Sequence, residues 1–144
     1  MVLTRAGAAH LDVLVELCRS YCELDHHHFD EVRTRAGLGP LLESDRHGVV
    51  WLIGSESDPG GYAVVTWGWS VEGGGAEALL DEIYVHDRGQ GVGSAAVVSI
   101  LDDCRERGMI RVFLETESHN EQARRLYTRL GFVTEESVWM SREL

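Results

Sequence analysis

The sequence predicts one α/β domain, spanning residues 1–144, in which an antiparallel meander of strands leads into a strand, loop, helix and strand unit. The chain has 144 residues, the usual length of one domain, and 44% of them are apolar, which is enough for a core. Runs of β-branched and aromatic residues, separated by turn formers, fill residues 48–85. A glycine-rich loop then precedes an amphipathic helical pattern and a further apolar run, which indicates parallel strands joined by a crossover helix.

The N-terminal part predicts a short strand and two helices. The strand is VLTRA at 2–6, and the first helix follows to about Glu23, because its apolar residues recur at helical spacing. A second helix is predicted within residues 25–45. Gly37, Gly39 and Pro40 are expected to interrupt it.

The middle of the chain predicts three antiparallel strands. The runs at 48–54 and 61–71 are joined by SESDPG, whose Ser, Asp, Pro and Gly favour turns, so they should form a hairpin. The glycines at 73–75 turn the chain again into a third strand that ends at Val85.

The last part predicts two helices and two strands. A helix starts near Val92 and ends at Gly108, and a buried strand covers 109–116. SHNE at 118–121 is a capping box that should start the next helix, with Gly131 as its C-terminal cap. The apolar triplet VWM at 138–140 predicts a final strand.

Composition excludes several classes of function. The 24 acidic and 13 basic side chains give a formal net charge of -11, which repels nucleic acid. No run approaches the roughly 18 apolar residues of a membrane span, and the first segment lacks a signal-peptide core, so we expect a cytoplasmic protein without a membrane partner. Cys18, Cys22 and His26 recur at a spacing that can hold zinc, but the two cysteines lie on the helix face that must be buried. We therefore expect core packing and no metal.

The loop HDRGQGVGS at 86–94 carries three glycines directly before a helix. A Walker loop needs a lysine after its last glycine, and a Rossmann loop needs GxGxxG, whereas this loop has Ser94 at the third glycine position. With these two loop types excluded, the loop offers a set of backbone N–H groups at the positive end of a helix, where a pyrophosphate can bind. A plain turn between strand and helix is the alternative.

Two motifs in this half of the chain together resemble a known family. LLDEIYVHDRGQGVGSAAV, followed by ETESHNEQARRLYTRLGF, resembles the GNAT superfamily of acetyl-CoA-dependent N-acetyltransferases. Arg88, Gly91 and Gly93 match the family's RxxGxG loop. Its NxxAxxLYxxxGF signature matches Asn120, Ala123, Leu126, Tyr127, Gly131 and Phe132. The likeness is close over residues 78–133.

The resemblance implies the GNAT fold, an α/β (α+β) domain with a mixed central sheet of about six to seven strands and about four flanking helices. The sheet would be antiparallel in its N-terminal half, with a splayed parallel pair at its centre. Acetyl-CoA would be the co-substrate, with its pyrophosphate on the glycine loop and its pantetheine arm between the splayed strands. The residues thereby assigned to acetyl-CoA are Ile83, Tyr84, Val85, Arg88, Gly89, Gln90, Gly91, Val92, Gly93, Ser94, Asn120 and Tyr127.

Acetyl transfer to an amine suggests two catalytic residues. An alkyl amine with a pKa near 10.4 is neutral in only about one molecule in 2,500 at pH 7, so a base helps. Glu82 and Asp81 adjoin each other on one strand, which sends their side chains to opposite faces. We assign the base to Glu82, acting directly or through water; Asp81 and water alone are the alternatives. Tyr127, in its signature context, would face the sulfur and protonate the leaving thiolate.

The acidic pair also suggests the acceptor. In diamine acetyltransferases a similar pair stands at this point of the fourth strand and is associated with cationic amines, which favours a diamine or polyamine. The segment after the first helix corresponds to the wall of the acceptor site in the family. The expected substrate contacts are therefore Asp81, Glu82, Glu23, Asp25 and His28, although an exposed loop at 23–28 is the alternative.

Other functions remain open at this point. A protein N-terminus, a lysine side chain or an aminoglycoside-type antibiotic can serve as the amine acceptor in this family. A noncatalytic acyl-CoA sensor is an alternative of another class, disfavoured because Tyr127 and the acidic pair are retained. Homodimers are common in the family, so we expect a homodimer, and the terminal residues VWMSREL could join its interface.

Overall fold

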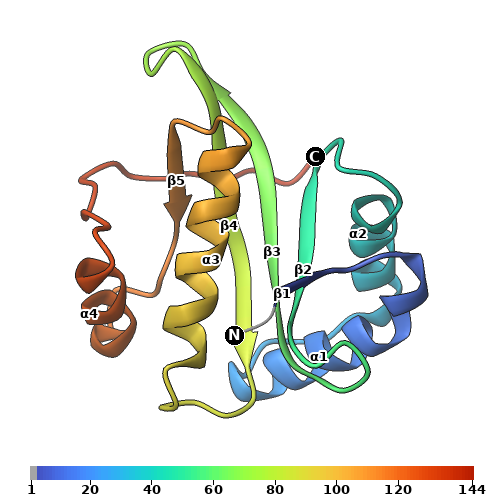
Figure 1. Cartoon of the computed structure of the whole chain (residues 1–144). Helices are drawn as coiled ribbons and strands as arrows, with labels where there is room; N and C mark the ends of the chain where they lie inside the picture. The colour runs from blue at the N-terminus through green and yellow to red at the C-terminus, as the bar shows by residue number, and fades with distance from the viewer. Residues whose placement is uncertain (1–2) are drawn as a thin grey trace.

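The computed structural model describes residues 3–144 (Figure 1). In chain order the elements are β1 (Leu3–Arg5), a short 3-10 helix η1 (Ala8–His10), α1 (Leu11–Leu24), α2 (Glu31–Glu43), β2 (Gly48–Gly54), β3 (Pro59–Ser70), β4 (Gly75–Val85), α3 (Val92–Glu106), β5 (Arg111–Leu114) and α4 (Glu121–Arg129). The four α-helices match the expected number. None of the helices within residues 3–144 has both the length and the apolarity needed to cross a bilayer.

One sheet contains all five strands, in the order β1-β2-β3-β4-β5. Neighbours from β1 to β4 pair antiparallel, and β4 pairs parallel with β5, so the predicted mixed sheet is confirmed. The parallel pair lies at the edge of the described sheet, so its predicted place at the centre is wrong. The prediction of about six to seven strands is wrong for this structure. The expected strand at 138–140 is not formed, and β5 covers only part of the predicted 109–116.

Helices cover both faces of the sheet, with α1 and α2 on one face and α3 and α4 on the other (Figure 1). Each face has its own apolar cluster, because alternate residues of every strand point to opposite faces. Tyr62, Val64 and Tyr84 pack toward α1 and α2. Val65 and Leu80 pack toward α3, and Tyr127 of α4 packs against the same cluster.

The second helix is continuous, so the predicted interruption by its glycines and proline is wrong. Asp30 caps its first turn, where the carboxylate accepts a hydrogen bond from the Arg33 N–H at 3.1 Å. Pro40 lies inside α2 and cannot donate a backbone hydrogen bond. Leu38, Leu41 and Leu42 surround that position in sequence, and all three are buried. Their burial outweighs the local cost of the proline.

The start of α4 differs from the predicted capping box. Asn120, not Ser118, is the N-cap, and its side-chain oxygen accepts a hydrogen bond from the Ala123 N–H at 3.0 Å. The predicted C-terminal end is confirmed, because Gly131 follows the helix with a φ of 96°, which suits glycine.

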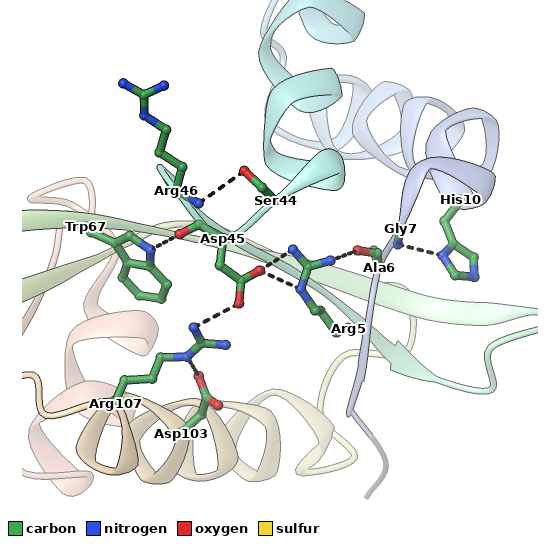
Figure 2. Close-up of polar contacts among 10 residues, drawn as sticks. All are labelled: Arg5, Ala6, Gly7, His10, Ser44, Asp45, Arg46, Trp67, Asp103 and Arg107. Carbon is green, nitrogen blue, oxygen red and sulfur yellow. Dashed lines mark hydrogen bonds and ion pairs between the residues drawn. The ribbon is translucent and has the colours of Figure 1, made fainter.

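A polar cluster around Asp45 ties distant elements together (Figure 2). Arg5 donates to one Asp45 carboxylate oxygen at 2.7 Å, and Arg107 donates to the other at 3.1 Å. The Trp67 indole N–H donates to the Asp45 carbonyl at 2.8 Å, and Arg107 also donates to Asp103 at 2.6 Å. The turn before β2 is thereby joined to β1, β3 and the end of α3.

Candidate active site

The parallel strands β4 and β5 separate halfway along β4. Their last register pair is Leu80 with Leu114. The β3–β4 register skips the next residue, Asp81, which therefore forms a β-bulge. Beyond it, residues 82–85 pair with β3 on one side only within the described structure. Their other backbone groups border the space where the two strands diverge.

Glu82 points from this divergence toward the α1 face of the sheet. Its Oε1 accepts a hydrogen bond of 2.6 Å from the Tyr62 hydroxyl, and Tyr62 is fully buried. Burial raises the pKa of the Glu82 carboxyl, the Tyr62 hydrogen bond lowers it, and the neighbouring Asp81 charge raises it; the net direction is upward. Partial desolvation likewise raises the pKa of Asp81. Glu82 is thus a stronger base than an exposed glutamate.

Three tyrosine rings and one histidine form a connected group, in which Tyr62 contacts this carboxylate. The ring centroids of Tyr21 and Tyr84 are 5.8 Å apart, and that of Tyr62 is 6.3 Å from Tyr84. The Tyr84 hydroxyl and His86 Nδ1 share a hydrogen bond of 2.8 Å. Tyr62 and Tyr84 are buried, so Tyr21, which is partly exposed, is the one phenol of this group that a ligand can contact.

The end of α1 contributes further acidic charge. Burial raises the pKa of Tyr21 to about 12, and the negative charges of Asp25 and Glu82 act in the same direction. The charges of Asp25 and Glu82 thus both raise the pKa of the same group, the Tyr21 hydroxyl. The side chains of Glu23 and His28 are exposed and make no hydrogen bond or ion pair in the described structure, so it does not bring them to this cluster.

Tyr127 reaches the same region from the opposite face. Its ring packs edge-to-face against Phe132 with the centroids 5.6 Å apart, and burial raises its pKa. An ionised Tyr127 would act to raise the pKa of Tyr21. Asn120 uses its side-chain oxygen to cap α4, which leaves its amide nitrogen as a donor.

The glycine loop joins β4 to α3 and is exposed along its length. Gly91 is the N-cap of α3 with a φ of 75° and makes no side-chain hydrogen bond, and Gly89 has a φ of 81°. A side chain at Gly93 would meet no atom within 4 Å, and its φ is not positive. The fold therefore needs glycine at 89 and 91, but not at 93. The first N–H groups of α3 have no side-chain cap, an arrangement that fits a bound phosphate. Arg88 is exposed beside them.

Sequence reasoning missed Tyr62 and gave Tyr21 no functional role. Tyr62 stands directly opposite Tyr84 in the β3–β4 register, two residues from the position opposite Glu82. Because residues two apart in a strand share a face, the hairpin register would have revealed the contact. The bulge at Asp81 shifts that register, and the sequence carried no clear sign of it.

Comparison with known proteins supports the likeness in sequence. The family model described as "Acetyltransferase (GNAT) family" matches residues 11–132. The chain is 30% identical over 105 residues to the L-amino acid N-acyltransferase MnaT of Escherichia coli K12. The matched region covers 72% of this chain and 55% of that protein. The chain thus spans about half the length of this curated relative.

Solved structures share the fold over nearly the whole chain. An integron cassette protein from the mobile metagenome of Cole Harbour Salt Marsh has a TM-score of 0.86 at 26% identity, covering 99% of this chain and 90% of that one. An aminoglycoside acetyltransferase from an uncultured soil metagenomic sample, crystallised with trehalose, has a TM-score of 0.81 at 16% identity. The likeness covers 99% of this chain and 95% of that one. With the family model matching most of its length, the chain belongs to the GNAT acetyltransferase family.

Proposed function

We propose that this protein is an acetyl-CoA-dependent N-acetyltransferase whose acceptor is a small cationic amine of the diamine or polyamine type. The observation that carries the proposal is the Glu82 carboxylate, held by Tyr62 where β4 and β5 diverge. Family membership and the relative named as an N-acyltransferase support the reaction class. The acidic and phenolic surroundings of Glu82 support the acceptor class.

The chain offers suitable groups for each part of acetyl-CoA. Backbone N–H groups of residues 88–94 would hold the pyrophosphate, with Arg88 beside them. Main-chain groups of Ile83, Tyr84 and Val85, which face away from β3, would pair with the pantetheine arm. Asn120 would donate its free amide N–H to that arm.

Glu82 would act on the acceptor nitrogen. Acetyl-CoA supplies a thioester carbonyl, and the amine must lose a proton to attack it. The Glu82 carboxylate takes that proton directly or through a water molecule. Because its pKa is raised, Glu82 is better matched to this transfer than an ordinary glutamate, while the Tyr62 hydrogen bond holds its orientation.

Tyr127 would act on the departing sulfur. As the amide bond forms and the carbon–sulfur bond breaks, the sulfur needs a proton, which the Tyr127 hydroxyl donates. Burial keeps this phenol protonated at neutral pH, as a proton donor must be. The phenol recovers a proton from solvent before the next turnover.

Charge around the acceptor region favours a cation over an amino acid. The proposed acceptor region would include Asp25, Asp81 and Glu82, and the chain as a whole has a formal charge of -11. The carboxylate of an amino acid acceptor would face these charges unless an arginine compensated them. The relative named as an L-amino acid N-acyltransferase makes amino acids the second candidate. A protein amine, an aminoglycoside and the noncatalytic sensor remain outcomes of the test.

The test is release of free thiol from acetyl-CoA in the presence of polyamines, aminoglycosides, amino acids and peptides. All 13 basic residues are arginine, so no lysine of the chain can act as acceptor. We expect release with diamines or polyamines, and product mass increased by one acetyl group. Glu82→Gln should lower the rate of release by about 100-fold or more, whereas Glu72→Gln, in the exposed β3–β4 turn, should leave it unchanged. Release only with amino acids, or only with peptides, would contradict the acceptor class; acetyl-CoA binding without release from any amine would contradict the enzyme.

A further inference from the structure

Tyr21 differs from the other two tyrosines of the group that contacts Glu82. Tyr62 and Tyr84 are buried, and both hydroxyls have partners: the first donates to Glu82 and the second shares a hydrogen bond with His86. Tyr21 is half-buried, and its hydroxyl makes no hydrogen bond within residues 3–144. Its ring packs on the buried pair, with its centroid 6.5 Å from that of Tyr62 and 5.8 Å from that of Tyr84. The ring is therefore held in place on one side, while its exposed part can contact a ligand.

The last turn of α1, which carries Tyr21 and Cys22, is close to two carboxylates. Tyr62, against which the Tyr21 ring packs, donates its hydroxyl hydrogen to Glu82 at 2.6 Å. Asp25 follows α1 directly, and its backbone N–H donates to the Tyr21 carbonyl at 3.0 Å. Burial raises the pKa of the Cys22 thiol, and the negative charges of Glu82 and Asp25 act in the same direction. A ligand on the exposed part of Tyr21 is therefore within reach of both carboxylates.

The charge at this end of α1 does not suit the helix itself. The C-terminal end of a helix carries partial negative charge, which favours cations there. The last turn of α1 has no basic residue, and Glu23 and Asp25 add two carboxylates to it. Within residues 3–144 the ion-pair partner of Asp25 is His27, whose Nδ1 lies 3.6 Å from Asp25 Oδ2 and whose charge depends on pH. An ammonium group bound at Asp25 would supply the permanent positive charge that this helix end lacks.

We propose that Tyr21 gives the site its preference for acceptors with two amino groups. The reacting nitrogen would lie at Glu82, the methylene chain over the exposed part of the Tyr21 ring, and the remote ammonium group at Asp25. An aromatic ring suits this position, because its face attracts a cation and its carbon surface covers methylene groups. The inference rests on the proposed function, since it names the amines that the same site prefers.

Tyr21 would act on recognition of the acceptor and not on the chemical step. The remote ammonium group and the methylene chain do not change during acetyl transfer, so their contacts hold the bound acceptor and the transition state equally well. Loss of such contacts raises KM and leaves kcat unchanged. This division distinguishes Tyr21 from Glu82 and Tyr127, whose loss should lower kcat.

The first test compares 1,4-diaminobutane with butylamine, and 1,8-diaminooctane with octylamine, by release of thiol from acetyl-CoA. In the parent chain, kcat/KM should favour a diamine over the monoamine of the same length by about tenfold. Tyr21→Leu keeps an apolar side chain but removes the ring, and it should raise KM for that diamine by about fivefold or more with kcat unchanged. Trp69→Leu, at an exposed position on β3, is the matched control and should alter neither constant. Equal affinity of all three chains for acetyl-CoA, measured by calorimetry, checks that the variants are folded.

A second variant tests the remote ammonium group without touching the aromatic group. The Asp25 side chain is exposed, so Asp25→Asn leaves the packing of α1 intact. It should lower the preference for the diamine by about threefold to fivefold at low ionic strength and leave the monoamine unaffected. Glu106→Gln removes the same charge from the exposed last residue of α3 and should leave the preference unchanged.

The outcomes separate this inference from the proposed function. If the parent chain acetylates amines but uses diamines and monoamines equally well, the role of Tyr21 is overturned and the acetyltransferase remains. An unchanged KM for diamines in the Tyr21→Leu and Asp25→Asn chains has the same meaning. A lower kcat with unchanged KM in Tyr21→Leu would assign Tyr21 to the chemical step and would also overturn the inference. Thiol release with none of the amines would contradict the proposed function itself.

Discussion

The Tyr62 hydroxyl donates a hydrogen bond of 2.6 Å to Glu82 Oε1, joining β3 to β4 beside the β-bulge at Asp81. Tyr62 is fully buried, so it has no freedom to swing to another partner. Cys18 of α1 is also buried beside it, and burial raises the pKa of that thiol to about 11, which keeps it neutral. The Glu82 carboxylate therefore has a fixed neutral donor, the Tyr62 hydroxyl, on its buried side and the acidic Asp81 next to it in the strand.

Tyr62→Phe should move the acidic limb of the pH profile of kcat/KM to higher pH. Glu82 must be deprotonated to act as base, and the Tyr62 hydrogen bond is the influence that lowers its pKa. Without it, burial and the Asp81 charge raise that pKa further, while Tyr21 and Cys22 from α1 add no positive charge. The profile should be measured with acetyl-CoA affinity as a control. An unchanged limb with reduced activity would mean that Tyr62 only supports the fold.

Glu82→Gln should lower turnover by about 100-fold or more, the usual contribution of a general base. The same change should stabilise the fold at pH 7. The folded pKa of Glu82 is raised, so its contribution to stability is most favourable at low pH and falls as pH rises from the unfolded pKa through the folded one. Neutral glutamine removes that penalty and still accepts the Tyr62 hydrogen bond. Thermal melting at pH 7 and pH 4 should show the gain only at the higher pH; a loss at pH 7 would refute this account.

Much of the fold follows from local sequence patterns. Alternating apolar runs and turn residues predicted the antiparallel meander, and the helix from Val92 to Gly108 was correctly bounded. The predictions were wrong where contacts with residues distant in the sequence determine the secondary structure. Pro40 is a local reason to end a helix, but the buried leucines around it keep α2 continuous. The triplet at 138–140 has strand character, yet a strand forms only beside a partner edge.

The residues of the candidate site likewise fall into two groups, those that local motifs identify and those whose contacts depend on distant parts of the chain. Its glycine loop and Tyr127 stand in contiguous motifs, so they could be identified from the sequence, together with the acidic pair on β4. The Tyr62 contact depends on the register between β3 and β4, which shifts at the bulge. The local pattern of residues therefore does not reveal it.

Tyr127→Phe should keep acetyl-CoA binding but lower turnover at least about tenfold. The ring would still pack against Phe132, so the α4 wall keeps its shape, while the proton for the departing sulfur is lost. Acetyl-CoA affinity by calorimetry and turnover by thiol release separate the two effects. Full activity in this variant would remove Tyr127 from the mechanism.

Gly93→Ala should weaken acetyl-CoA binding by about tenfold, or about 1.4 kcal/mol, without lowering thermal stability. The added methyl meets no atom of the chain within 4 Å, and alanine favours a helix more than glycine does. It would instead occupy space beside the N-terminus of α3, where the pyrophosphate is proposed to lie. Gly37→Ala, in an equally open position on α2, is the matched control and should leave affinity unchanged. Equal affinities for the two variants would argue against a pyrophosphate at this loop.

Asp45→Asn should destabilise the fold at neutral pH by about 1 kcal/mol, a modest value because the carboxylate is partly exposed. Burial alone would raise the pKa of Asp45, but the hydrogen bonds from Arg5 and Arg107 outweigh it, and the net direction is downward. A carboxylate with a lowered folded pKa stabilises the protein above its unfolded pKa, and the contribution is lost as pH falls through the folded value. The difference in unfolding free energy between the parent and the variant should therefore be full at pH 6 and shrink as the pH falls below 3.8, the ordinary pKa of an aspartate.

Asp58→Asn, in the exposed β2–β3 turn, is the control and should show no such pH-dependent difference in urea titrations. A difference that persists undiminished at pH 2 would mean that Asp45 acts through its shape and not through its charge.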